Sequence, residues 1–203
     1  MILIASMFLV SIGYTMVIPF LPLYLLDIGV PEESIAIWTG VVFSSCFLVA
    51  GIMGPVWGKM ADTRGKKQMA IRAAVLLGFS YLFCGLSQNA WQMTAARAFM
   101  GFSNGFVAAS MAIISVSADP KNLGATLGMG QTALIVGGIA GPLVGGTLAH
   151  LIGIRNTFFI SAAFLWFVAV LVILYVREPK LGMVKKVESK ATTIGEDLSY
   201  AFR

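Results

Sequence analysis

Charged side chains are scarce in this 203-residue sequence. Asp, Glu, Lys and Arg make up 11% of it, whereas a soluble globular chain carries roughly a quarter. The stretches that contain none of the four are 1–26, 34–58, 73–96, 98–118, 122–154 and 156–176. A helix needs about 20 consecutive apolar residues to cross the hydrocarbon core of a bilayer. These repeated runs exclude a soluble globular protein and indicate a polytopic membrane protein.

Residues that bind metals, form disulfides or perform catalysis are also few. The two cysteines, Cys46 and Cys84, and the single histidine, His150, show no metal-ligand or disulfide spacing. The sequence contains no nucleophile–base set and no phosphate-binding loop. We therefore expect neither an enzyme nor a site for a metal, a cofactor or nucleic acid.

The long apolar runs are predicted to be helices. Backbone groups in hydrocarbon must bond within one segment or within a closed barrel, and these runs lack the alternation of barrel strands. The predicted spans are Ile2–Leu26, Ile35–Gly58, Gln68–Leu86, Trp91–Ser117, Leu123–Ala149 and Asn156–Val176. We therefore predict an all-α membrane fold, with a bundle of six transmembrane helices over residues 1–176 and a cytoplasmic tail over 177–203.

Basic residues gather on one side of these spans. The twelve on that side are Lys59, Arg64, Lys66, Lys67, Arg72, Lys121, Arg177, Lys180, Lys185, Lys186, Lys190 and Arg203. The opposite side has only Arg155, together with the acidic Asp27, Glu32 and Glu33. The positive-inside rule therefore predicts that both termini lie in the cytoplasm, with the chain in the lipid bilayer of the cell membrane.

The ends of the second and fifth spans resemble each other. At an offset of 88 residues, GKMADTRGKK (58–67) and GTLAHLIGIR (146–155) share two glycines, one alanine and a final basic residue. In the predicted topology the first copy faces the cytoplasm and the second faces outward. This pattern indicates an inverted repeat of three plus three helices, roughly 1–88 and 89–176, which is a common transporter design.

Four segments resemble motifs of the major facilitator superfamily. GKMADTRGKK resembles its loop signature, and RAFMGFSNG (97–105) resembles its fourth-helix arginine–glycine motif. GGIAGPLVGG (137–146) is similar to the motif of its drug:proton antiporters, and PFLPLYLLDIG (19–29) resembles a proline motif of that group. Because family members have two six-helix halves, the resemblance implies an N-terminal half whose partner is a C-terminal six-helix half, from the same gene or a second chain. The tail resembles the central loop.

The loop signature contains glycines that permit a turn and several charged residues beside them. Gly58 and Gly65 permit a tight turn and positive φ, and Asp62 is able to accept from amides at a helix start. By resemblance, this cluster latches against the C-terminal half when the cytoplasmic side is closed; the alternative is a solvated charged turn. The candidate latch residues are Gly58, Asp62, Arg64, Gly65, Lys66 and Lys67.

The fifth span carries small residues at helical spacing. Its candidate antiporter residues are Gly137, Gly138, Gly141, Pro142, Gly145 and Gly146. Small faces let helix backbones approach closely in lipid, and Pro142 removes one backbone hydrogen bond and bends the helix. Ordinary close packing is the alternative, because the antiport role comes only from the resemblance.

Arg97 is the one charge well inside a predicted span, and an ionisable group at depth marks function by default. The prolines of the first span leave the carbonyls of Thr15 and Ile18 without their usual donors. We hypothesise that Arg97 caps these carbonyls and so holds the first helix against the fourth. The resemblance implies a role for Arg97 in proton transfer, and a purely structural role is the alternative.

An amphipathic substrate cavity is predicted from aromatic, methionine and amide side chains. Its candidate residues are Tyr14, Phe20, Asn104, Met111 and Gln131. Each of these is alternatively a lipid-facing or packing residue. Near the outer ends of the spans, Tyr24, Trp38 and Trp91 are predicted to be interfacial anchors.

Acidic residues are missing from the interior of every predicted span. Proton exchange usually relies on a membrane-buried Asp or Glu, so a coupling acid is expected in the other half. The resemblance implies export of small lipophilic drugs in exchange for protons, by alternating access. The alternatives are a facilitator for a sugar or other polar metabolite, and a non-transporting half that needs a partner bundle.

Overall fold

The computed structural model describes residues 2–176, apart from the side chains of Asp62 and Arg64. The predicted tail at 177–203 lies outside this part. The helices are α1 (Ile2–Thr15), α2 (Leu21–Asp27), α3 (Ile35–Arg64), α4 (Lys66–Leu86), α5 (Ala90–Ser103), α6 (Phe106–Ser117), α7 (Leu123–Ile152) and α8 (Ile154–Tyr175), with short 3-10 turns η1 (Ile18–Phe20) and η2 (Glu32–Ser34). The described part is helical, and no strand interrupts it.

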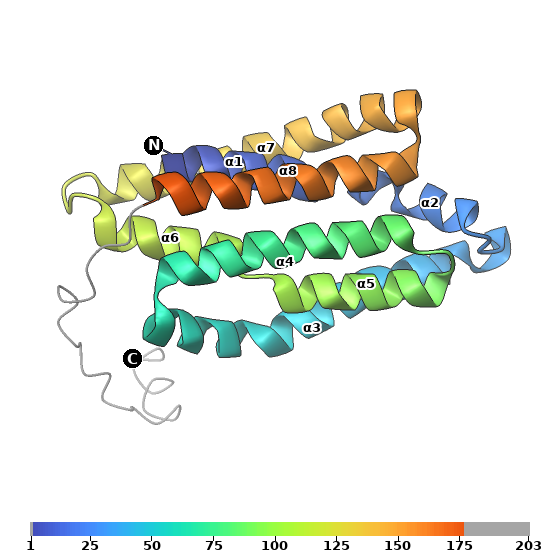
Figure 1. Cartoon of the computed structure of the whole chain (residues 1–203), viewed down its shortest axis with the longest axis horizontal. Coiled ribbons are helices and arrows are strands. Elements are labelled where there is room, and N and C mark those ends of the chain that lie inside the picture. Colours follow the sequence, from blue (N-terminus) through green and yellow to red (C-terminus); the bar gives the residue numbers. More distant parts are fainter. Residues whose placement is uncertain (1, 177–203) are drawn as a thin grey trace, which may run out of the picture.

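These helices form the six predicted spans, which lie side by side in one bundle (Figure 1). Four spans are single helices, namely α3, α4, α7 and α8. The first span consists of α1, η1 and α2, and the fourth consists of α5 and α6. The start of α1 and the end of α8 lie at the same end of the bundle, as an even number of spans requires.

The first and fourth spans are both broken near their middle. The first break follows Thr15, where Pro19 and Pro22 cannot donate backbone hydrogen bonds. The fourth span breaks at Asn104 and Gly105, where no proline is present and Gly105 has φ +125°. The break in the fourth span was not predicted, although Asn-Gly is a dipeptide typical of turns. The fourth-span break begins 88 residues after Met16, which is the offset of the sequence repeat.

Single glycines connect α3 to α4 and α7 to α8. Gly65 has φ +100° and Gly153 has φ +87°, conformations that only glycine adopts without strain. The positive φ predicted at Gly65 is therefore present. The turn predicted at Gly58 is wrong, because α3 continues to Arg64 and Gly58 lies within it. Most of the loop signature thus belongs to the C-terminal end of α3. The chain reverses direction at a single residue, Gly65.

The two groups of three helices are interlocked. α1 packs mainly along α7, and α5 packs mainly along α3, so the first helix of each group lies against the second helix of the other. α4 and α8, the third helices, pack along each other. This exchange of partners is the packing that an inverted repeat produces, and it gives the bundle one shared core rather than two.

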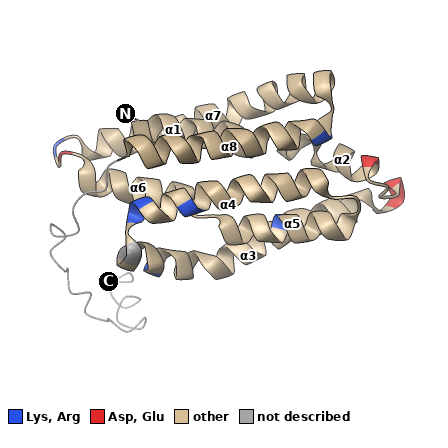
Figure 2. Cartoon of the chain, viewed as in Figure 1, with Lys and Arg blue, Asp and Glu red and all other residues tan. Residues whose placement is uncertain are grey.

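Charged residues lie mostly at the two ends of the bundle (Figure 2). Lys67, in the first turn of α4, donates to the carbonyl of Ile173 at the end of α8, 2.9 Å away. Arg155, in the first turn of α8, donates to the carbonyl of Ser87 just past α4, at 3.1 Å. Each cation therefore lies at the negative end of the neighbouring helix dipole, where it is stabilising.

Tyr24 also takes part in the contact between Arg155 and the end of α4. It is 1% exposed, and its hydroxyl lies 3.1 Å from the Gly85 carbonyl and 3.2 Å from the Ser87 carbonyl. Arg155 donates to the same hydroxyl at 3.3 Å. The prediction of an interfacial anchor at Tyr24 is therefore wrong, because the first span turns at its prolines and carries this ring into the core. Trp91 is 72% exposed, as an anchor requires.

Candidate functional site

α7 lies against the first span through its glycine face. The buried glycines of this face are Gly137, Gly141 and Gly145. A Cβ added at Gly137 would lie 2.6 Å from the carbonyl oxygen of Phe8, and one added at Gly145 would overlap the carbonyl of Met16. The close approach predicted from the glycine spacing is therefore present, and α1 with the turn after it is the partner.

The neighbouring stripe of α7 is less crowded. A Cβ at Gly138 would have Ser11 Oγ as its nearest neighbour, at 3.8 Å, and one at Gly146 would lie 3.3 Å from the Phe20 ring. α7 continues through Pro142 as one helix. The antiporter role of the six motif residues stays a prediction.

Carbonyls at the first break are bonded by α4 and by the chain itself. The Tyr81 hydroxyl, from α4, donates to the Tyr14 carbonyl. The backbone N–H of Leu21 donates to the Ile18 carbonyl. The hypothesis that Arg97 caps the Thr15 and Ile18 carbonyls is wrong, because its Nη1 bonds Met100 of its own helix and its Nε and Nη2 have no partner in the described residues.

Arg97 is nevertheless buried in the middle of the bundle, at 1% exposure. Its Nη1 donates to the sulfur of Met100 at 3.6 Å, and its guanidinium carbon lies 5.7 Å from the centre of the Phe43 ring. Nε and Nη2 have no partner in the described part of the chain. The charge also acts on nearby hydroxyl and thiol groups, which belong to Tyr14, Cys46, Tyr81 and Cys84. Arg97 is therefore a buried cation without a carboxylate in reach among the described side chains.

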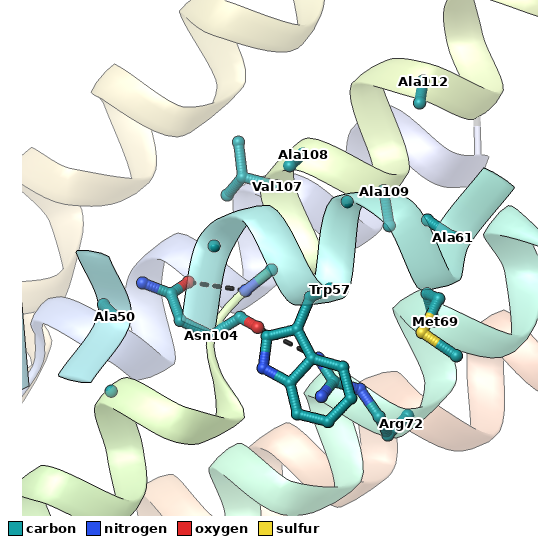
Figure 3. Close-up of a pocket in the computed structure, with 14 residues that line it drawn as sticks. Ala50, Trp57, Ala61, Met69, Arg72, Asn104, Val107, Ala108, Ala109 and Ala112 are labelled. Carbon is teal, nitrogen blue, oxygen red and sulfur yellow. Dashed lines mark hydrogen bonds between the residues drawn. The ribbon is translucent and has the colours of Figure 1, made fainter. Parts of the chain in front are cut away.

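A cavity of about 540 Å³ lies between α3, α4 and the broken fourth span (Figure 3). Its walls are mostly alanine and glycine, and its larger lining residues are Trp57, Met69, Arg72 and Asn104. The Asn104 side-chain oxygen accepts from the Gly105 N–H at 2.7 Å, which fixes the amide beside the break. The combination of apolar walls and a few polar groups is typical of small-molecule sites.

The structure does not gather the five predicted substrate residues in this cavity. Only Asn104 lines it. Tyr14 is near Arg97, and Phe20 faces Gly146 of α7. Met111 packs against Gly130 of α7, whereas Gln131 is exposed. The prediction rested on residue type, which does not determine which side chains of different helices meet. A substrate role for these residues stays a prediction.

The candidate latch residues lie at the end of α3 and the start of α4. Gly65 is buried, and Lys66 and Lys67 begin α4. The predicted contacts of Asp62 and Arg64 fall on side chains outside the described residues. Nothing lies within 4 Å of a Cβ added at Gly58, so this part of α3 presents an open surface.

Sequence reasoning missed three site residues, Trp57, Arg72 and Tyr81. Arg72 was counted only as a basic residue of the cytoplasmic side, although its position inside the predicted third span could have marked it. Trp57 and Tyr81 resembled ordinary apolar residues of their spans. Their partners are backbone carbonyls of other helices, and such pairings leave no pattern in a sequence.

Comparisons with known proteins agree with this geometry. The chain is 39% identical over 180 residues to the multidrug resistance protein MdtG of Proteus mirabilis, covering 88% of this chain and 45% of that protein. It is 38% identical over 180 residues to the MdtG of Serratia proteamaculans, covering 88% of this chain and 44% of that protein. The chain thus spans about half the length of these curated relatives.

A solved structure shares the fold. The crystal structure of the human organic anion transporter MFSD10 (TETRAN) matches with a TM-score of 0.71 at 19% identity, over 87% of this chain and 46% of that one. The family model of the Major Facilitator Superfamily matches residues 3–203, almost the whole chain. With six apolar helices in the arrangement of half such a transporter, the chain belongs to the Major Facilitator Superfamily.

Proposed function

We propose that this chain is the N-terminal six-helix bundle of a multidrug exporter, which moves small lipophilic compounds by alternating access in exchange for protons. The observation that carries the proposal is the match to proteins named multidrug resistance protein over these same six helices. Rocking of this bundle against a second one would open the cavity alternately to the two sides of the membrane.

The open glycine face of α3 supports a second bundle as partner. A Cβ added at Gly40, Gly51, Gly54 or Gly58 would meet nothing within 4 Å, whereas one added at Gly137, Gly141 or Gly145 of α7 would meet the first span. In the apolar stretch of the second span, which contains α3, only 11% of the residues are buried, compared with 56% in that of α4. Small residues on an open face let another helix approach closely in lipid. A C-terminal six-helix half is the partner that fits this surface.

Proton coupling is proposed to depend on an acid of that other half. Among the described side chains, Asp27, Glu32, Glu33 and Asp119 all lie at span ends or in loops. Arg97 is buried and lacks a carboxylate partner within the same part of the chain. A carboxylate brought close by the second bundle would be stabilised in its charged form by this arginine, and binding of a proton or of substrate would then compete with that pairing.

Transport is tested with a chimera, because the relatives are about twice as long as this chain. The chain replaces the aligned N-terminal portion of the Proteus mirabilis relative, and the chimera is expressed in a drug-hypersensitive bacterial host. We expect efflux of a fluorescent lipophilic dye that collapses when the proton gradient is dissipated. An Arg97→Met chimera, expressed at the same level, should lose this efflux.

The 203-residue chain alone is the matched control for the chimera, and it should not export the dye. Energised efflux by the isolated chain would contradict the need for a second bundle. A chimera that reaches the membrane at normal levels and exports no lipophilic compound would contradict the exporter proposal. Uptake of a sugar by the chimera would favour the facilitator alternative.

A further inference from the structure

The break in the fourth span, inside a predicted transmembrane run, leaves backbone carbonyls without their helical donors. α5 ends at Ser103 and α6 begins at Phe106. The last carbonyls of a helix have no donor within it, and inside a bilayer each unsatisfied group costs several kcal/mol. Donors from other helices therefore stabilise a break at this position.

Two side chains from other helices supply those donors, and both are drawn beside the cavity in Figure 3. Trp57, from α3, donates its Nε1–H to the Phe102 carbonyl at 2.8 Å. Arg72, from α4, donates from Nη2 to the Asn104 carbonyl at 3.0 Å. The Arg72 guanidinium carbon lies 3.5 Å from the centre of the Trp57 ring, so the two caps also stack on each other. We call this pair the Arg72–Trp57 clamp.

Among the described side chains, no carboxylate pairs with the cation of the clamp. Nε and Nη1 of Arg72 have no hydrogen-bond partner in the described residues, so the carbonyl of Asn104, the negative end of the α5 dipole and the indole face are what stabilise the charge. The stacking fixes Arg72 of α4 against Trp57 of α3, and the two hydrogen bonds attach this pair to the end of α5. Movement of α5 would therefore cost the clamp both hydrogen bonds.

The position of Arg97 depends on this fixed end of α5. Arg97 lies on α5, and its hydrogen bond goes to Met100 of the same helix. No hydrogen bond in the described part ties its guanidinium to a neighbouring helix. Its depth and direction are therefore set by what holds α5 itself. Gly101 lies against the carbonyl of Cys46 in α3. α5 also packs along α4, where the Ser80 and Ser103 hydroxyls are 3.2 Å apart, and the clamp holds its end.

Below the break, the fourth span separates from α3. The cavity lies between α3 and α6, with small residues such as Gly54 and Ala108 on its walls. α6 has almost no contact with α3, whereas α5 packs along it. α4 packs along both α5 and α6, so the clamp matters mainly for α3: Trp57 joins α3 to the fourth span at the level where their direct packing ends.

We propose that Arg72 and Trp57 are positioning residues of the transport cycle. They cap the broken fourth span and thereby hold Arg97 at the depth and orientation at which it acts. This inference rests on the proposed function for its role in transport, but the clamp itself is testable in the isolated chain.

The first experiment measures backbone hydrogen exchange of the 203-residue chain in lipid nanodiscs. Arg72→Met removes one charged hydrogen bond, so exchange at residues 102–109 should rise roughly tenfold. Trp57→Phe keeps an aromatic ring and removes the bond to Phe102, so its effect should be smaller. Trp166→Phe is the matched control, because Trp166 Nε1 donates to the Val75 carbonyl at 3.2 Å, away from any break.

The native cysteines provide a second readout in the same samples. Cys46 and Cys84 are both buried, and Cys46 lies at the contact between α3 and α5. Loss of the clamp should speed modification of Cys46 by a small thiol reagent and leave Cys84 unchanged, as resolved by mass spectrometry. If Arg72→Met matches Trp166→Phe in exchange and in Cys46 reactivity, the clamp does not hold α5 and the proposal fails.

Transport by the chimera tests the functional part. Because the clamp acts through Arg97, Arg72→Met should lower the maximal transport rate and leave KM nearly unchanged. The expected decrease is roughly tenfold, which corresponds to the loss of one charged hydrogen bond. Arg72→Lys keeps the charge without the planar fork, so it should restore part of the rate. A rise in KM alone would mean that Arg72 contacts substrate and would overturn the positioning role. A wild-type chimera without transport would contradict the proposed function, and the exchange results would still decide on the clamp.

Discussion

Two adjacent glycines of α7 allow a sharp test of the packing between α7 and α1. Gly137 faces the first span, and a Cβ added there would lie 2.6 Å from the Phe8 carbonyl oxygen. Carbon–oxygen contacts normally lie at about 3.3 Å or more, so Gly137→Ala must move the two helices apart by about 0.7 Å. Gly138 has its nearest neighbour at 3.8 Å, and Gly138→Ala should fit without movement.

The free energies follow from this difference. Both substitutions gain the same helix propensity, about 1 kcal/mol, so that contribution cancels between them. Overpacking a tight contact costs about 1–3 kcal/mol. We therefore expect Gly137→Ala to be less stable than Gly138→Ala by about 2 kcal/mol, which is roughly a 30-fold change in the folding equilibrium.

The assay is equilibrium unfolding in mixed micelles, followed by tryptophan fluorescence. A thiol-reactive dye gives an independent signal, because the two cysteines are buried in the folded chain. Equal stabilities of the two variants would refute the idea that backbone contact holds α7 against α1. A less stable Gly138→Ala would place the contact face on the wrong side of the helix.

Three further predictions concern the ends of the spans. Gly65→Ala should destabilise the chain by about 1–3 kcal/mol because φ is +100° there, whereas Gly58→Ala, inside α3 and facing open space, should not; a loss of stability at Gly58, measured in the same micelles, would contradict this. Tyr24→Phe removes the hydroxyl beside two buried carbonyls and should lower the free energy of unfolding by about 1–3 kcal/mol, and an unchanged value would argue against the tie at that end. With a membrane-impermeant maleimide on intact cells, Glu33→Cys should be labelled and Thr63→Cys should not; the reverse pattern would invert the proposed orientation.

The number and course of the spans were predictable from the sequence because hydrocarbon imposes a simple rule. Each of the six charge-poor runs is long enough to cross a bilayer, and each became a helical span. The glycine face of α7 was also predictable, because residues such as Gly137 and Gly141 recur at the period of a helix. In a membrane, such a row of small residues typically allows two helices to pack closely. Gly65 was predicted to turn for the same local reason, its freedom at positive φ.

The break in the fourth span was decided only by tertiary structure. Asn104 and Gly105 form a dipeptide typical of turns, but they stand in a long apolar run without a proline, and such a run usually continues as one helix. The break is stable because Trp57 and Arg72, more than 30 residues earlier in the chain, bring donors to its carbonyls. The surroundings of Arg97 depend on the same pairing, so its burial could be predicted from the sequence and its partners could not. Local spacing determines which residues share a helix face, whereas contacts between distant helices determine which polar groups meet.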